Sequence, residues 1–101
     1  MENFNKYQFI ENLTAEITAE IEKGNISSYY EIQEYIDAEI DTACIYYSDC
    51  FAICFALNAT DFDDPAYAGA RNITELAYYA LADFVQGTLE FSELIKLAEA
   101  N

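Results

Sequence analysis

The sequence predicts an all-α fold: a compact bundle of three long helices or four to five shorter ones, with an acidic loop before the last helix. Apolar residues recur every three or four positions along most of the chain, which gives a helix one apolar face. Residues that interrupt helices are rare, with 3 Gly and 1 Pro. The chain is 53% hydrophobic and 16% aromatic, so we expect a single domain over residues 1–101 with its own core.

The first predicted helix covers residues 4–23. Its apolar positions form one stripe, which consists of Tyr7, Ile10, Leu13, Ile17 and Ile21. The glutamates of this segment lie mostly off the stripe. Gly24 supplies the C-terminal stop, because glycine adopts the left-handed conformation that commonly ends a helix.

The second helix begins behind Ser28, which forms a capping box with Glu31 three residues later. From Ile36 to Leu57, apolar residues follow in unbroken steps of four and three. No Pro or Gly interrupts them, so one helix over residues 29–58 fits the pattern. Two helices with a bend near residues 41–45 fit nearly as well, and intrinsic propensity does not decide between these arrangements.

An acidic loop is predicted for residues 58–72, which hold the Pro and the cluster Asp61, Asp63 and Asp64. A short helical turn can start at Pro65 behind an Asp64 cap. The last helix then begins at Asn72.

Gly87 lies in the middle of that last apolar pattern. It predicts either a kink or a new helix start near Ser92.

The segment 43–57 is apolar on all sides, with 13 of its 15 residues apolar. Such a helix is either buried centrally, the leading interpretation, or partly buried at a subunit contact. In the second case, a homodimer contact would use Tyr46, Phe51, Ile53 and Phe55. Three cysteines in the same region, Cys44, Cys50 and Cys54, are interpreted as small buried hydrophobic residues of a protein in a reducing cytoplasm.

A formal net charge of −15 is the strongest functional indication. Between Gly24 and Ala70 there are nine acidic residues and no basic one. Such a surface argues against direct binding of nucleic acid or of an anionic membrane. It favours a basic protein surface that normally holds another polyanion, most often nucleic acid.

Two rows of carboxylates are predicted. On the second helix, Glu31, Glu34, Asp37 and Asp41 step by three, three and four, which gives a charge roughly every 5 Å along one face. Duplex DNA carries one charge per roughly 3.4 Å on each strand. A row on the first helix would supply the other strand. The candidate partner-binding surface therefore comprises Glu11, Glu16, Glu20, Glu31, Glu34, Asp37, Asp41, Asp61, Asp63 and Asp64.

An enzyme is not expected, because the chain has no His, the commonest general base and metal ligand. Cys50 and Cys54 stand one helical turn apart without further ligands at metal spacing. Residues 61–65 resemble the opening of a calcium loop, but Ala66 and Asn72 replace its Gly and its Glu. No Gly-rich phosphate loop is present. We therefore expect no catalytic residue, no metal and no cofactor.

In pattern, the chain resembles the Ocr-type anti-restriction proteins of phages. The resemblance rests on Ile45-Tyr46-Tyr47-Ser48-Asp49-Cys50-Phe51-Ala52-Ile53, preceded by an acidic amphipathic helix and followed by an acidic loop and a long last helix. It implies an all-α homodimer, bent and DNA-shaped, whose carboxylates occupy the DNA channel of type I restriction-modification enzymes. DNA-mimic anti-CRISPR proteins fit the same composition.

A second resemblance is to the colicin-type immunity proteins, acidic four-helix inhibitors of nuclease toxins. Residues 20–23, before a capped second helix, and residues 45–49 are similar to segments of that family. We rank this resemblance second, because the family carries its tyrosines in a short helix, whereas here they lie in a long apolar one.

The leading hypothesis is a DNA mimic that inhibits a host defence enzyme, with a basic DNA-binding protein or nuclease complex as its partner. The alternatives are an immunity-type inhibitor of a nuclease toxin and a non-inhibitory assembly protein that oligomerises through its apolar helix. No signal peptide or membrane span is recognised in the sequence. The expected location is the cytoplasm of an infected or mobile-element-carrying bacterial cell.

Overall fold

The computed structural model describes residues 3–67 and 69–101. Within them, the chain forms five α-helices and one 3₁₀ turn, with no strand. In chain order these are α1 (Lys6–Glu22), α2 (Tyr29–Ala43), α3 (Tyr47–Ala56), η1 (Pro65–Tyr67), α4 (Ile73–Thr88) and α5 (Phe91–Ala100). The predicted all-α class is confirmed, in the version with shorter helices.

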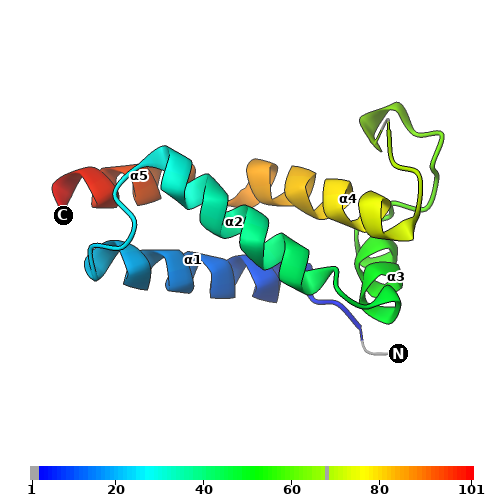
Figure 1. The fold of residues 1–101 in the computed structure, drawn as a ribbon, viewed down its shortest axis with the longest axis horizontal. Coiled ribbons are helices and arrows are strands. Elements are labelled where there is room, and N and C mark those ends of the chain that lie inside the picture. Colours follow the sequence, from blue (N-terminus) through cyan, green and yellow to red (C-terminus); the bar gives the residue numbers. More distant parts are fainter. Residues whose placement is uncertain (1–2, 68) are drawn as a thin grey trace.

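Helix α4 occupies the centre of the arrangement, since it packs against α2, α3 and η1, while α1 packs against α2 and α5. The molecule is elongated, 42 × 27 × 18 Å. In Figure 1, α3 and the loop of residues 58–72 lie at one end of the long axis, whereas the connection from α1 to α2 and the C-terminus lie at the other. No helix in the described ranges is long and apolar enough to span a membrane.

One cluster of buried side chains draws on all five helices. Its largest fully buried members are Leu13, Ile17, Ile21, Ile32, Ile36, Ile40, Ile53, Leu76, Leu81, Val85 and Cys50. Among the described residues, no polar or charged side chain is buried. The acidic residues of these ranges therefore lie at the surface, as the sequence predicts.

Helix α1 begins two residues later than predicted, because Asn5 caps it. The Asn5 side chain accepts a 2.9 Å hydrogen bond from the Gln8 backbone N–H, which satisfies one of the free donors at a helix start. The predicted stop is confirmed. Gly24 adopts a φ of +83°, and the N–H of Asn25 donates back to the Glu20 carbonyl at 2.9 Å.

The apolar segment after α2 bends instead of continuing as one helix. Residue Tyr46 is extended, with φ −104° and ψ 141°, and α3 starts behind it. The Cys50 thiol donates a hydrogen bond of 3.2 Å to the backbone carbonyl of Cys44 at the end of α2. This contact satisfies a carbonyl that has no partner within its own helix, so it stabilises the bend.

The loop of residues 58–72 contains the predicted turn at Pro65. Its cap is confirmed, since the Asp64 carboxylate accepts a 2.9 Å hydrogen bond from the Ala66 N–H. Helix α4 starts where predicted, and the Asn72 side chain accepts from the Glu75 N–H at 2.9 Å. The Asp64 and Asn72 caps thus determine where η1 and α4 begin.

The break between α4 and α5 falls at Leu89 and Glu90, not at Gly87. Gly87 lies inside α4, and Leu89 turns the chain with a ψ of 138°. Of the two predicted outcomes, the new helix start is confirmed, one residue before Ser92.

Candidate interaction surfaces

The first candidate surface joins α1 to α2. The Tyr35 hydroxyl on α2 donates a hydrogen bond to Glu16 Oε1 on α1, with an oxygen–oxygen distance of 3.3 Å. Glu20 on α1 and Glu39 on α2 also lie close enough to act on Tyr35 electrostatically. We call this group the α1–α2 acidic surface; it consists of Glu16, Glu20, Tyr35 and Glu39.

Burial, followed by the nearby carboxylates, raises the pKa of two groups of the α1–α2 acidic surface. The pKa of Tyr35 rises to about 12, first because the ring is partly buried and then because Glu16 and Glu39 lie nearby. The pKa of the Glu39 carboxyl is raised by burial and by Glu16. Both effects disfavour a further negative charge, as expected where carboxylates gather without a cation.

Acidic side chains also occupy the opposite flank of α2, which faces α4. The Tyr78 hydroxyl donates a 3.3 Å hydrogen bond to Asp37 Oδ1. The pKa of Tyr78 rises to about 12, through burial and then the charges of Asp37 and Asp41. At 100° per residue, Asp37 and Glu39 point about 160° apart. Helix α2 therefore carries carboxylates on two flanks: Asp37 and Asp41 of the predicted row on one, and Glu39, outside that row, on the other.

Glu31 is held at the start of α2. The predicted cap is present, since Ser28 Oγ accepts from the Glu31 N–H at 3.2 Å. The Glu31 carboxylate reaches one residue further back than a standard capping box and accepts from the Ser27 N–H at 3.0 Å. These bonds lower the pKa of Glu31, the Ser27 backbone contributing most. Glu34, in contrast, is exposed.

The remaining predicted acidic residues lie apart from this surface. Glu11 is exposed on α1, but at 100° per residue it points about 140° away from Glu16, so the two do not share a row. Asp61, Asp63 and Asp64 lie in the loop at the α3 end of the molecule (Figure 1). The structure thus divides the ten predicted residues among several faces.

Glu39 and Tyr35 are the site residues that the sequence prediction missed. Both lie one turn apart beside the buried stripe of Ile32, Ile36 and Ile40, where side chains face a neighbouring helix. The predicted row of carboxylates on the outward-facing side of α2 does not include this flank. A polar residue next to a buried stripe is the signal that identifies it.

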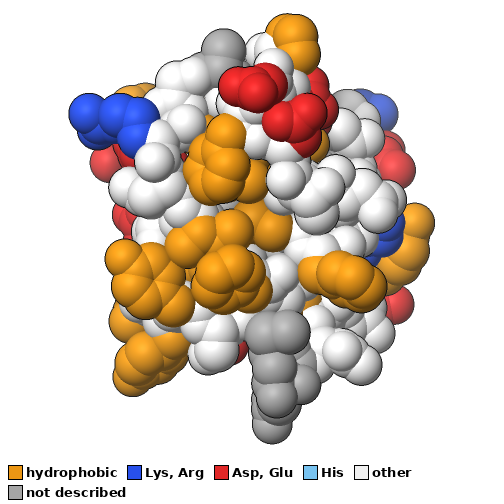
Figure 2. Space-filling model, turned by 90° about the vertical axis from the view of Figure 1, so that its right-hand side faces the viewer, with side chains coloured by type: hydrophobic (Ala, Val, Ile, Leu, Met, Phe, Trp, Pro, Cys, Tyr) orange, Lys and Arg blue, Asp and Glu red, His pale blue; other side chains and the backbone are white. Residues whose placement is uncertain are grey.

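The second candidate surface is formed by α3 and the loop behind it. Tyr46, Phe51 and Phe55 are 68%, 53% and 78% exposed. Ile53 is 0% exposed, so its predicted place in a dimer contact is wrong: it points into the core against α4. We call the exposed apolar set the α3 aromatic face; it consists of Ile45, Tyr46, Tyr47, Phe51, Phe55 and Phe62. Figure 2 views this end, with apolar side chains gathered across its centre.

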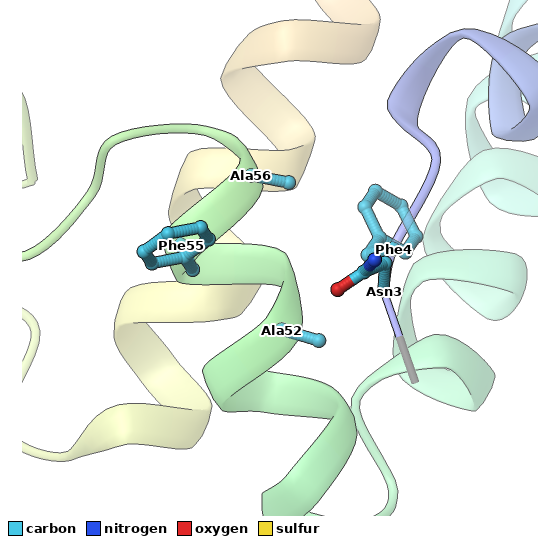
Figure 3. Close-up of a pocket in the computed structure, with 5 residues that line it drawn as sticks. All are labelled: Asn3, Phe4, Ala52, Phe55 and Ala56. Atoms are coloured by element: carbon cyan, nitrogen blue, oxygen red, sulfur yellow. The ribbon is translucent and has the colours of Figure 1, made fainter. Parts of the chain in front are cut away.

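Two hollows flank Phe55 on this face. One, of about 260 Å³, lies between the N-terminal segment and α3 and is lined by Asn3, Phe4, Ala52, Phe55 and Ala56. In Figure 3, the two alanines point across it toward Phe4, whereas the Phe55 ring turns to the other side of α3. The other hollow, of about 330 Å³, is lined by Phe51, Cys54, Phe55, Ala59, Thr60, Phe62, Ile73 and Leu76.

The cysteine thiols are buried. Cys44, Cys50 and Cys54 are all free and buried, as predicted. Burial raises the pKa of Cys44 to about 12 and that of Cys54 to about 11. With their pKa values raised in this way, the thiols of Cys44 and Cys54 are poor nucleophiles and poor metal ligands. In the described part of the chain, no group of three potential ligands is placed to hold a metal ion.

Basic side chains contribute little to either surface. In the described ranges, the ion pairs are Arg71 with Glu75 at 3.3 Å and Lys96 with Glu93 at 3.8 Å. The ammonium of Lys6 lies over the Tyr7 and Phe84 rings, 5.4 Å and 5.5 Å from their centroids. None of the ten predicted acidic residues takes part in an ion pair within these ranges.

The chain was compared with known proteins, and no family model, curated protein or solved structure matches it. The resemblances to Ocr-type and immunity proteins therefore stay predictions.

Proposed function

We propose that this protein is a DNA mimic that inhibits a host defence enzyme by occupying its DNA-binding site. Its target is a basic restriction-modification or CRISPR complex. The observation that carries the proposal is the crowding of Glu16, Glu20 and Glu39 around Tyr35, with no cation of the described residues paired to them. Together with burial, which contributes most, these charges raise the pKa of Tyr35 to about 12. Repeated like-charge contacts cost stability, and a partner that supplies the cations offsets that cost.

The amount of charge suits such a competitor. A duplex as long as the 42 Å axis of the molecule carries about 24 phosphates, at one per about 3.4 Å on each strand. The protein carries a net −15, and only one side of a duplex faces a given binding groove. The charge density available to a DNA-binding site is therefore of the same order.

The mechanism follows from rigid presentation of the carboxylates. Helices packed through a common core hold Glu16 and Glu39 in place before binding, so little side-chain entropy is lost when Lys or Arg of the target engages them. The net negative charge also steers the protein toward a cationic groove and raises the association rate. Inhibition is competitive with DNA and requires no chemical step.

A competition experiment tests the proposal. Purified type I restriction enzymes and DNA-binding CRISPR complexes are loaded with a fluorescent duplex, and its displacement by the protein is measured. We expect displacement by stoichiometric protein, weakening steeply between about 50 and 500 mM salt. A five-charge variant should lose displacement; it carries Glu16→Gln, Glu20→Gln, Asp37→Asn, Glu39→Gln and Asp41→Asn.

A control variant removes three charges outside the predicted surface, through Glu90→Gln, Glu93→Gln and Glu99→Gln on and beside α5. It should displace DNA nearly as well as the wild type. Equal inhibition by both variants, or an affinity that does not change with salt, would contradict the proposal. A nuclease toxin domain in the same panel tests the immunity-type alternative.

A second candidate function is assembly, which the α3 aromatic face favours. Phe55 is 78% exposed and Tyr46 68% exposed, and exposed apolar patches of this kind often mark protein contacts. In this reading the charge only keeps the protein in solution. Sedimentation velocity distinguishes it, since a stable oligomer that Phe55→Ser dissociates would support assembly.

A further inference from the structure

We propose that the α3 aromatic face binds a cationic amphipathic segment of a partner protein. Apolar side chains of that segment enter the hollows on both sides of Phe55, and its Lys or Arg side chains pair with Asp61, Asp63 and Asp64. This contact lies at the α3 end of the molecule, away from the connection of α1 to α2 (Figure 1). It does not depend on DNA mimicry.

The first argument is apolar exposure on one side of α3. Cys50 and Ile53 point into the core, while Phe51 and Phe55 on the same helix face solvent. Phe62 extends the patch from the neighbouring loop. Clustered aromatic side chains are the usual anchors of protein contacts, since they bury much area with few rotatable bonds.

The second argument is shape. The hollows beside Phe55 measure about 260 Å³ and 330 Å³. Pockets for small molecules usually range from about 300 to 1,000 Å³, so these two lie at or below the lower limit. They suit single side chains such as Leu or Phe. Phe55 borders both hollows, and its ring turns away from the first one (Figure 3). One anchor of a segment would therefore pack beside the ring, and another would pack on Ala52 and Ala56 next to Phe4.

The third argument is the charge at the edge of the patch. Asp61, Asp63 and Asp64 flank Phe62 in the sequence, and Asp49 lies on α3 itself. In Figure 2, acidic side chains lie directly above the apolar centre, and Lys and Arg side chains lie only toward the sides. An apolar centre with an acidic edge is complementary to apolar anchors surrounded by Lys or Arg.

Charge also argues against a second copy of this chain as the occupant. A symmetric contact through α3 would bring the acidic edges of two copies together, each copy carrying a net −15. Like charges placed across a contact oppose association. A cationic partner turns the same edge into an attraction. A basic amphipathic helix, with apolar anchors three and four residues apart, is the simplest segment of this chemistry.

The probe is a labelled synthetic helical peptide of about 18 residues, with Leu at helical spacing and Lys elsewhere. A second peptide replaces every Leu with Ser and keeps the charge. Binding to the full chain is followed by fluorescence anisotropy at about 150 mM salt. We expect the Leu peptide to bind at least about tenfold more tightly than the Ser peptide, since anchor side chains carry most contact energy.

Variants of the protein locate the contact. Phe55→Ser and, separately, Phe51→Ser should each weaken binding of the Leu peptide about tenfold or more. Tyr30→Ser is the matched control, because Tyr30 is an aromatic residue, 70% exposed, on α2. Changing the loop acids to Asn keeps their hydrogen-bond acceptors and should reduce both affinity and salt dependence. Circular dichroism checks that each variant stays folded.

Three results would overturn the proposal. Equal peptide binding by the wild type and both Phe variants would show that attraction to the charge alone holds the peptide. No preference for the Leu peptide would show the same. A concentration-dependent dimer that Phe55→Ser dissociates would assign the face to a second copy. The five-charge variant of the α1–α2 region should still bind the peptide, so failure of DNA mimicry is distinguished from failure here.

Discussion

The Tyr35 hydroxyl and the Glu16 carboxylate are joined by a hydrogen bond of 3.3 Å that links α2 to α1. The same contact places the Tyr35 hydroxyl among carboxylates. It therefore stabilises the fold only while the phenol keeps its proton. Tyr78 and Asp37 repeat this relationship between α4 and α2, also at 3.3 Å. Helix α2 is thus connected on both flanks by a neutral donor and an acidic acceptor.

Alkaline pH should therefore destabilise the protein. The pKa of Tyr35 rises from 10.0 to about 12, and that of Tyr78 does the same. A raised pKa means that the stabilisation is complete below the unfolded value of 10.0 and is lost as the pH rises through about 12. We expect urea midpoints to fall across this window, and to fall less in a variant with Tyr35→Phe and Tyr78→Phe.

Tyr30→Phe is the control for alkaline unfolding, because Tyr30 is exposed. It should leave the pH dependence unchanged. Ultraviolet titration of tyrosinate in the folded wild type should detect late titration of Tyr35 and Tyr78, and a raised pKa for Tyr67, which burial and Asp83 shift in the same direction. If no tyrosine titrates later than a free tyrosine, the proposed role of Tyr35 and Tyr78 in alkaline unfolding is contradicted.

Glu39 should be a residue at which charge removal stabilises the fold. Its pKa is raised by burial and by Glu16, so the folded state favours the protonated form, and wild-type stability decreases as the pH rises through that pKa. Glu39→Gln should increase the free energy of unfolding at pH 7 by about 0.2–0.5 kcal/mol. The gain should vanish at low pH, where Glu39 is already protonated.

Glu11→Gln is the matched control for Glu39→Gln, because Glu11 is exposed on α1 and has no acidic neighbour three or four residues away. Chemical denaturation at two pH values measures both variants. A destabilised Glu39→Gln protein at neutral pH would show that Glu39 contributes a favourable contact.

The elements that the sequence predicted correctly are those set by local signals. Ser28, Asp64 and Asn72 cap helices where their spacing indicated, and Gly24 ends α1. The two-residue difference at the start of α1 arises from the Asn5 cap, which the periodicity of the apolar residues does not reveal. Caps and periodicity act over a few residues, so the sequence exposes them directly.

The sequence left open what depends on contacts between helices. The bend within residues 29–58 is accompanied by a thiol–carbonyl contact between residues six apart, Cys50 and Cys44, which helix periodicity does not reveal. Which side of the apolar segment faces solvent depends on how α3 packs on α4, so Ile53 was misplaced. The membership of the acidic surface depends on the packing of α1 on α2, which brings Glu16 to Tyr35.

Removal of the Ser28 cap should weaken the start of α2. Its hydroxyl accepts from the Glu31 N–H at 3.2 Å, and loss of such a cap costs about 1 kcal/mol. Ser28→Ala should therefore lower the free energy of unfolding by about that amount. Ser28→Asn, which keeps an acceptor, should retain most of the stability. An unchanged Ser28→Ala protein would show that the Ser27 contacts of Glu31 hold the helix start alone.

The buried thiols should resist alkylation in the native protein. Burial raises the pKa of Cys44 to about 12 and that of Cys54 to about 11, so little thiolate forms at about pH 8. Iodoacetamide should label these residues only as fast as the fold opens, and labelling should accelerate with urea. Mass spectrometry of the intact protein gives the number of alkylated cysteines directly. Rapid native labelling would show that the core around α3 is open.

Cys50 should contribute more to the free energy of unfolding than its small side chain suggests, because its thiol donates a hydrogen bond to the Cys44 carbonyl at the end of α2. The residue is fully buried, and its Sγ lies 3.2 Å from the Cys44 carbonyl oxygen. Cys50→Ala leaves that carbonyl without its donor and should lower the free energy of unfolding by about 1–3 kcal/mol. Cys50→Ser keeps a donor and should lose less. Because the bend sets the direction of α3, Cys50→Ala should also weaken peptide binding at the α3 aromatic face, measured by fluorescence anisotropy under conditions where the variant remains folded. An unaffected affinity would show that packing on α4 alone orients α3.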